Sequence, residues 1–206
     1  IIDTTAPSIT APDSITMEAT SADSNTVTLS NPVSSDLVDI PSISNNAPDV
    51  FPLGETTVTW TAVDASGNSA SATQTVTIID TTAPALSIPD DQTVEATSLD
   101  QTFVNIGQAE AHDITGISSI VNNAPDVFPL GSTLIAWTAT DNHGNITTAY
   151  QTITVEDTIA PTIIIPEDIT AEAIDPMINH IELGELVTSD SVGVESITND
   201  KLDTFP

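Results

Sequence analysis

The chain repeats itself with a fixed period. The segment Asp-Thr-Thr-Ala-Pro at residues 3–7 returns at residues 80–84, and as Asp-Thr-Ile-Ala-Pro at residues 157–161, so both intervals have the same length. A ten-residue string, Asn-Asn-Ala-Pro-Asp-Val-Phe-Pro-Leu-Gly, is identical at residues 45–54 and 122–131. A long repeat predicts an array of small domains, each of which forms one folding unit. The predicted domains are residues 1–79, 80–156 and 157–206.

The third repeat is predicted to be truncated. Asn199, Asp203 and Phe205 keep register with the earlier copies, but the sequence stops before the counterparts of Trp60 and of the last two strands. We therefore expect that this copy does not close its own core. No start methionine or signal peptide opens the chain. The sequence is interpreted as a segment of a longer protein whose neighbouring repeats are its first partners.

The apolar residues alternate with a period of two. Val58, Trp60 and Ala62 share one face of a predicted strand, whereas the threonines between them take the other face. Val76 with Ile78 and Val27 with Leu29 show the same period. Roughly seven short strands in about 77 residues are typical of a sandwich. The predicted fold is all-β, a tandem array of immunoglobulin-like β-sandwich repeats of this length, with Trp60 and Trp137 in their cores.

The charge is strongly one-sided. Thirty Asp and Glu face one Lys, which gives a net charge of −29, while 39% of the residues are apolar, enough for a folded domain. A chain with almost no Lys or Arg cannot release counterions from phosphates, which excludes nucleic acid and anionic membrane surfaces as partners. No apolar run reaches the roughly 18 residues of a membrane span. The chain has no Cys, hence no disulfide and no thiolate metal site.

These motifs together resemble one known family. An Asp-Thr-Thr-Ala-Pro start, a Glu in the second strand, a Phe-Pro-Leu-Gly turn at residues 51–54, the run Thr57 to Asn68 and the closing strand at residues 74–78 are similar to the hyalin repeat (HYR) family. The resemblance covers essentially the whole chain. It implies an immunoglobulin-like fold and an extracellular or cell-surface role in adhesion or structure, without naming a ligand.

Acidic residues recur at fixed positions in the copies. Calcium prefers six to eight hard oxygen ligands, which carboxylates and loop carbonyls supply. We therefore predict calcium as the cofactor. The candidate ligands are Asp3, Glu18, Asp36, Asp64, Asp80, Glu95, Asp113, Asp141, Asp157, Glu172 and Asp190.

One junction shows how these acids are expected to meet. In an immunoglobulin-like topology Asp80 of the linker lies near Asp113 and Asp141 of its own repeat, and Glu18 of the preceding repeat faces the same linker. The expected site is an oxygen cage of these four carboxylates. Two alternatives stay open: the acids cap turns by accepting hydrogen bonds from their own backbone, or they form a solvated, salt-adapted surface.

No catalytic arrangement recurs. His112, His143 and His180 each fall where the other copies carry Ser, Thr or Phe, which argues against a Ser-His-Asp or zinc site. The chain is therefore predicted not to be an enzyme. Asn145 begins the Asn-Ile-Thr glycosylation acceptor pattern, which repeat 1 lacks at the matching position.

The predicted function is a structural or adhesive extracellular stalk or surface-fibre segment built from calcium-stabilised repeats. Expected partners beyond the neighbouring repeats are further copies in a filament, a cell-surface or matrix protein, or a glycan. The alternative is a ligand-binding accessory module, for instance for a polysaccharide, in a larger secreted enzyme. That alternative predicts exposed aromatic side chains on one copy.

Overall fold

The computed structural model describes residues 2–175 and 179–199, and this part of the chain is built from strands without any helix. It therefore holds no helix long and apolar enough to cross a membrane. The strands are β1 (Ser8–Thr10), β2 (Ile15–Glu18), β3 (Val33–Ser35), β4 (Ser42–Asn45), β5 (Gly54–Val63), β6 (Ser69–Ile79), β7 (Ala85–Ser87), β8 (Gln92–Glu95), β9 (Glu110–His112), β10 (Ile117–Asn122), β11 (Gly131–Asp141), β12 (Ile146–Glu156), β13 (Thr162–Ile164) and β14 (Val187–Ser189).

The chain divides into two compact units. The first holds the whole of repeat 1 and the segments of repeat 2 that contain Asp80, Asp113, Asp141 and His143. Its ranges are Ile1–Ser87, Ala109–Val121 and Thr138–Ala149; those of the second unit are Ile88–Gln108, Asn122–Trp137 and Tyr150–Pro206.

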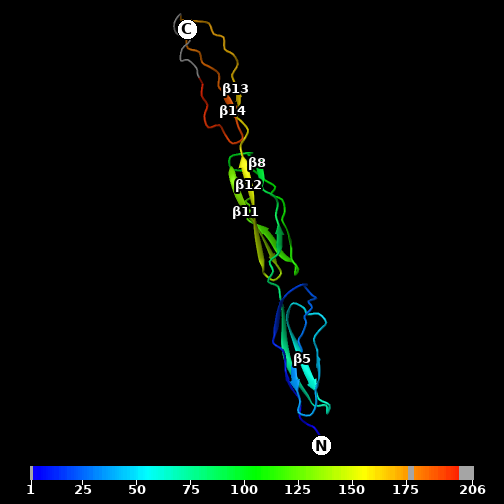
Figure 1. The fold of residues 1–206 in the computed structure, drawn as a ribbon. Coiled ribbons are helices and arrows are strands. Elements are labelled where there is room, and N and C mark those ends of the chain that lie inside the picture. The colour runs from blue at the N-terminus through cyan, green and yellow to red at the C-terminus, as the bar shows by residue number, and fades with distance from the viewer. Residues whose placement is uncertain (1, 176–178, 200–206) are drawn as a thin grey trace. The chain divides into compact units, whose positions relative to one another are not determined.

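Repeat 1 is a sandwich of a four-stranded sheet in the order β2-β6-β5-β4 and a two-stranded sheet of β1 and β3. Strand β5 (labelled in Figure 1) forms an antiparallel hairpin with β6, from Gly54 opposite Ile78 to Val63 opposite Ser69. Strand β2 lies parallel to β6. Alternation along β5 buries Val58, Trp60 and Ala62. The prediction of their inward face and of Trp60 as a core residue is confirmed.

Repeat 2 reproduces this arrangement one period further along the chain. Its sheets are β10-β11-β12-β8, with β8 parallel to β12, and β7-β9. Ile135, Trp137 and Ala139 on β11 are buried like their counterparts on β5. The predicted fold class, tandem all-β immunoglobulin-like repeats, is confirmed. In the third repeat β13 pairs with β14; the predictions for Asp203 and Phe205 lie outside the described residues.

Each core contains a glutamine that the strand pattern did not single out. Gln74 on β6 accepts a hydrogen bond from the Trp60 indole at 3.2 Å and donates to the carbonyl of Asp13 at 2.8 Å. Gln151 makes the equivalent bond to Trp137 at 3.0 Å. These bonds satisfy the buried indole N–H, which burial would otherwise leave without a partner.

The segment of Val27 and Leu29 is not a strand, so each of the first two repeats has six strands and not roughly seven. Both side chains pack against the core of repeat 1, as the alternation predicts. Regular pairing is limited to one bridge, between Asn25 and Phe51. Pro48 and Pro52 flank Phe51, and proline has no N–H with which to extend a ladder.

Candidate cation-binding sites

The first candidate site, here called the Asp3 cluster, consists of Asp3, Asp36 and Asp64. Asp3 precedes β1 and Asp36 follows β3, and the antiparallel pairing of these strands brings the two segments together. Asp64 enters the same place from the turn between β5 and β6. One carboxylate oxygen of each residue lies within 4.8 Å of those of the other two. Strand pairing therefore assembles acids that are distant from one another in the sequence.

Asp64 also caps its own turn. Its Oδ1 accepts the backbone N–H of Asn68 and its Oδ2 accepts the Asn68 side-chain amide, both at 2.8 Å. The side-chain bond from Asn68 is the main reason why the pKa of Asp64 is lowered. The same amide donates to the carbonyl of Asp3 at 3.3 Å. The turn-capping alternative and a cation site therefore use the same carboxylate.

Asp3 is only half satisfied. Its Oδ1 accepts the N–H of Thr5 at 3.0 Å, but its Oδ2 is buried and has no hydrogen-bond partner. A buried carboxylate oxygen without a donor is costly, and the two neighbouring carboxylates add like-charge repulsion. A hard cation removes both penalties. The donor set of three carboxylates thus fits calcium, whose remaining ligands would be carbonyls or water.

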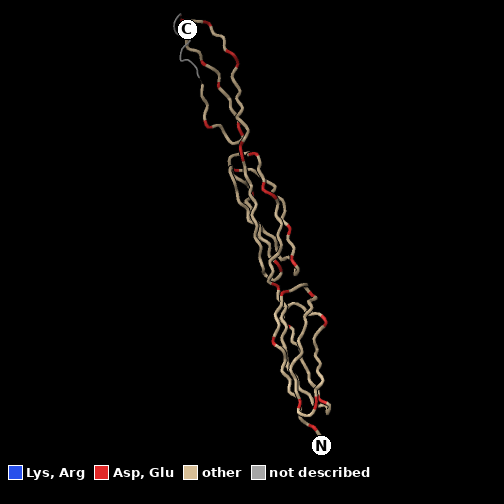
Figure 2. The backbone as a smooth tube through the Cα atoms, in the orientation of Figure 1, with Lys and Arg blue, Asp and Glu red and all other residues tan. Residues whose placement is uncertain are grey.

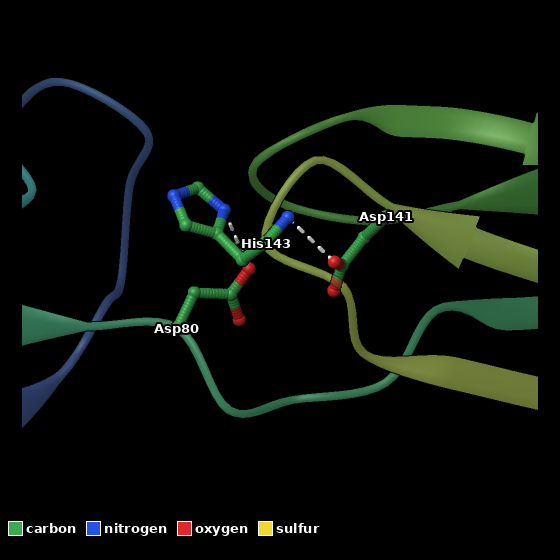
Figure 3. Close-up of side chains that lie close together, drawn as sticks. All are labelled: Asp80, Asp141 and His143. Carbon is green, nitrogen blue, oxygen red and sulfur yellow. Dashed lines mark hydrogen bonds and ion pairs between the residues drawn. The ribbon is translucent and has the colours of Figure 1, made fainter.

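The second candidate site, here called the Asp80 cluster, contains Asp80, Asp141 and His143 (Figure 3). The Asp80 side chain is fully buried and Asp141 is 1% exposed. His143 places Nδ1 3.4 Å from Asp80 Oδ2, and its backbone N–H donates to Asp141 Oδ1 at 2.7 Å. Burial raises the pKa of Asp141, but hydrogen bonds from Asn145, His143 and Gly144 outweigh it and the net pKa is lowered.

The four residues of the expected cage share donors. Thr82 N–H lies 3.1 Å from Glu18 Oε1 and 3.2 Å from Asp80 Oδ1. Thr115 links Asp80 to Asp113, because its Oγ1 lies 2.6 Å from Asp80 Oδ2 and 2.8 Å from Asp113 Oδ1. The Asn145 side-chain amide links Asp80 to Asp141: it donates to the backbone carbonyl of Asp80 at 3.2 Å and to Asp141 Oδ2 at 2.8 Å. Protein donors therefore connect the predicted ligands here.

Glu18 holds the linker that follows β6. Its carboxylate accepts the N–H and hydroxyl of Thr81 at 2.8 and 2.7 Å, and the Thr82 hydroxyl at 2.8 Å. The bonds from Thr81 and then those from Thr82 lower the pKa of Glu18 from 4.5 to about 2. Glu95 repeats the contact by accepting the N–H and hydroxyl of Thr158 at 2.8 and 2.7 Å. The pKa of Glu95 is likewise lowered, mainly by the Thr158 hydroxyl.

The remaining predicted ligands belong to the third repeat. Asp157 accepts the N–H of Ile159 at 3.3 Å, and Asp190 accepts the N–H of Val192 at 2.8 Å. Glu172 is exposed. Within the described ranges, these three residues form no group of three clustered ligands.

Acidic residues occur throughout the described chain, which contains no Lys or Arg (Figure 2). The single Lys of the sequence, Lys201, lies outside the described residues. Neither cluster therefore has a basic side chain to balance it, apart from the imidazole of His143.

Sequence reasoning named His143 only to argue against a catalytic or zinc site, and it did not single out Thr115. It searched for positions that recur, and these two occur only in repeat 2, where repeat 1 carries Ser66 and Val38. The signal that could have found them is the comparison of the copies at the residues next to Asp141 and Asp113.

A family model for the HYR domain matches residues 2–78 and 79–155. The chain belongs to the HYR domain family. The recognition made from the motifs is thus confirmed. HYR domains are non-enzymatic modules of extracellular or cell-surface proteins, which confirms the predictions of a non-enzymatic chain and of this localisation.

Relatives of this HYR chain include two proteins named hyalin. Hyalin of Strongylocentrotus purpuratus is 31% identical over an alignment of 226 residues, which covers 100% of the chain and 19% of that protein. Hyalin of Lytechinus variegatus is 30% identical over 189 residues, which cover 84% of the chain and 36% of that protein. The chain thus spans about a third or less of either relative. Among solved structures, Drosophila N-cadherin EC1-4 matches with a TM-score of 0.36 and 13% identity, covering 74% of this chain and 50% of that one.

Proposed function

We propose that the chain is a structural and adhesive segment of an extracellular protein, built from HYR repeats of which repeat 1 binds calcium at the Asp3 cluster. The adhesive part rests on the family and on the hyalin relatives. The chain supplies a run of repeats and no recurring catalytic group, which suits a spacer or contact surface. Neighbouring repeats of the same protein, whose boundaries we place at residues 80 and 157, are its first partners.

The buried, unpartnered Oδ2 of Asp3 carries the calcium proposal. Asp36 and Asp64 each place a carboxylate oxygen within 4.8 Å of one carboxylate oxygen of Asp3. Calcium bound there would join the segment before β1 to the loop after β3 and to the β5–β6 turn. Because the three segments are distant in sequence, such a site stabilises the folded repeat against the unfolded chain.

Thermal unfolding tests this function. The full chain is melted in EDTA and then in millimolar CaCl2, with NaCl added so that the ionic strength is equal. Calcium at a hundredfold excess over its Kd is expected to add about 2.7 kcal/mol of stability, and therefore to raise the Tm of repeat 1.

Asp3→Asn and Asp49→Asn are the variant and its matched control. The amide of Asp3→Asn can still accept the Thr5 N–H but lowers the charge of the cluster, so we expect the calcium-specific rise in Tm to be lost. Asp49 is exposed and outside the cluster, so its variant should keep the rise. Equal shifts in sodium and calcium would leave the acids as a solvated surface and end the calcium proposal.

A second candidate function, glycan binding, draws on two aromatic side chains. Phe103 is 78% exposed and Tyr150 61% exposed, and repeat 1 has Thr at both matching positions. Exposed aromatics confined to one copy are what the accessory-module alternative predicts. Affinity electrophoresis through gels that contain a neutral polysaccharide tests it: retardation that a Phe103→Thr/Tyr150→Thr variant loses would support this function, and unchanged mobility would remove it.

A further inference from the structure

Two acids of the Asp3 cluster, Asp3 and Asp64, have their counterparts Asp80 and Asp141 in the Asp80 cluster, but the side chains beside them differ. Repeat 2 changes three of the surrounding positions: Val38 becomes Thr115, Asp39 becomes Gly116 and Ser66 becomes His143. One change adds a hydroxyl donor, one removes a carboxylate and one adds an imidazole. Each change lowers the need for a cation at the Asp80 cluster.

Thr115 occupies the same backbone position as Val38. The N–H of Val38 donates to Asp36 Oδ1 and that of Thr115 donates to Asp113 Oδ1, both at 2.8 Å. From this common position the Thr115 hydroxyl lies 2.6 Å from Asp80 Oδ2. Valine has no donor, and the matching Asp3 Oδ2 has no partner. The hydroxyl therefore offers Asp80 Oδ2 a donor, at the shorter of its two carboxylate contacts, that the matching oxygen of repeat 1 lacks.

His143 and Gly116 act in the same direction. His143 Nδ1 lies 3.4 Å from Asp80 Oδ2, whereas Ser66 gives the Asp3 oxygen no hydrogen bond. Asp39 has a second buried oxygen without a partner, Oδ1, while its Oδ2 accepts the N–H of Ala65 at 3.0 Å. Gly116 removes that carboxylate from repeat 2. Among the described residues, repeat 1 thus has two buried carboxylate oxygens without a partner, one on Asp3 and one on Asp39, whereas the Asp80 cluster has a hydroxyl and an imidazole.

We infer that repeat 2 replaces the cation with its own side chains, so that Thr115 and His143 hold Asp80 and divalent-cation binding is confined to the Asp3 cluster. A cation at Asp80 would compete with the Thr115 hydroxyl for Oδ2, and a hydrogen bond to a buried carboxylate is among the stronger ones. The first two repeats therefore hold one cluster of each kind, one that depends on a cation and one that does not. This inference rests on the proposed calcium site in repeat 1.

Calcium stoichiometry tests the inference, measured by isothermal titration calorimetry on the full chain. Relative to the unmodified chain, Asp3→Asn should bind one calcium ion fewer, whereas Asp80→Asn should bind the same number. The double variant Thr115→Val/His143→Ser gives repeat 2 the side chains of repeat 1 at the two positions that contact Asp80, and it should bind one ion more. A loss of one ion in Asp80→Asn would overturn the inference and leave the proposed function standing. An unchanged number in Asp3→Asn would overturn the proposed function itself.

Melting curves of two single variants keep the test decisive if the double variant does not fold. Thr115→Val should lower the Tm in EDTA, and calcium should restore most of the loss because the cluster then resembles that of repeat 1. Val38→Thr should raise the Tm in EDTA and shrink the calcium effect, because the hydroxyl reaches Asp3 Oδ2. A Thr115→Val loss that calcium does not reduce would overturn the inference.

Discussion

At the scale of single residues, Glu18 makes the stability of the chain depend on pH. The hydrogen bonds from Thr81 and Thr82 lower its pKa in the folded state from 4.5 to about 2. A lowered pKa contributes stability that is fully present above pH 4.5 and is lost as the pH falls through the folded value. We therefore expect Glu18→Gln to flatten the fall in Tm between pH 4.5 and pH 2, as measured by circular dichroism.

Glu55→Gln is the matched control for this prediction. Glu55 is an exposed glutamate on β5 whose register partner is Thr77 of β6 and not a linker threonine. Its variant should keep the pH slope of the unmodified chain. If Glu18→Gln and the unmodified chain lose stability in parallel over this range, the threonine contacts do not hold the carboxylate in solution.

The sequence could predict which acids form the clusters, because these acids recur in the copies. It could not predict fully which of them lie close together in the folded repeat. Asp3, Asp36 and Asp64 meet through the pairing of β1 with β3 and through the β5–β6 turn. The sequence pattern predicted at which end of the sandwich each acid lies. It did not predict which hydrogen-bond donor contacts which carboxylate oxygen. A comparison that looks for recurring residues does not find Thr115, because the other copies carry valine at this position.

At the scale of elements, the β5–β6 hairpin depends on Gly67. Its φ of +88° lies in the left-handed region, and a Cβ added there would meet nothing within 4 Å. Gly67→Ala should therefore cost only the backbone penalty, about 1–2 kcal/mol, in urea unfolding followed by tryptophan fluorescence in a Trp137→Phe background, where Trp60 is the reporter. Gly67→Asn should cost less, because Asn tolerates this region better. An equal cost for both variants would mean that contacts and not backbone conformation decide the turn.

The buried face of each strand was easier to predict than the backbone hydrogen bonds that pair it with a neighbouring strand. Alternation identified the inward side chains of β5 and β6, because burial on one face follows directly from a period of two. For Val27 and Leu29 it identified the inward face but not the missing strand. Ladder formation depends on the partner segment, and Pro48 and Pro52 lie in that partner.

At the scale of the whole molecule, the fixed period of the sequence predicted the architecture, and the differences between copies set the chemistry at each cluster. Repeats 1 and 2 use the same sheet orders and the same Trp–Gln pair. This common core keeps each of the two repeats folded. The substitutions at Thr115, Gly116 and His143 leave the cores untouched, so each copy can adapt its acidic cluster independently.

The net charge of −29 leads to the last prediction. Self-repulsion among acids destabilises a compact state, and salt shortens its range from about 30 Å at 0.01 M to about 3 Å at 1 M. In EDTA, raising NaCl across this range should therefore raise the Tm. Each kcal/mol of repulsion that salt removes is expected to raise it by about 4–8 °C, the shift typical of a domain as small as one repeat. Tetramethylammonium chloride should act almost equally, because screening depends on charge and concentration rather than on ion fit. A Tm that stays flat would show that solvent already screens the acids, and the calcium-dependent rise could then be assigned to the Asp3 cluster without correction.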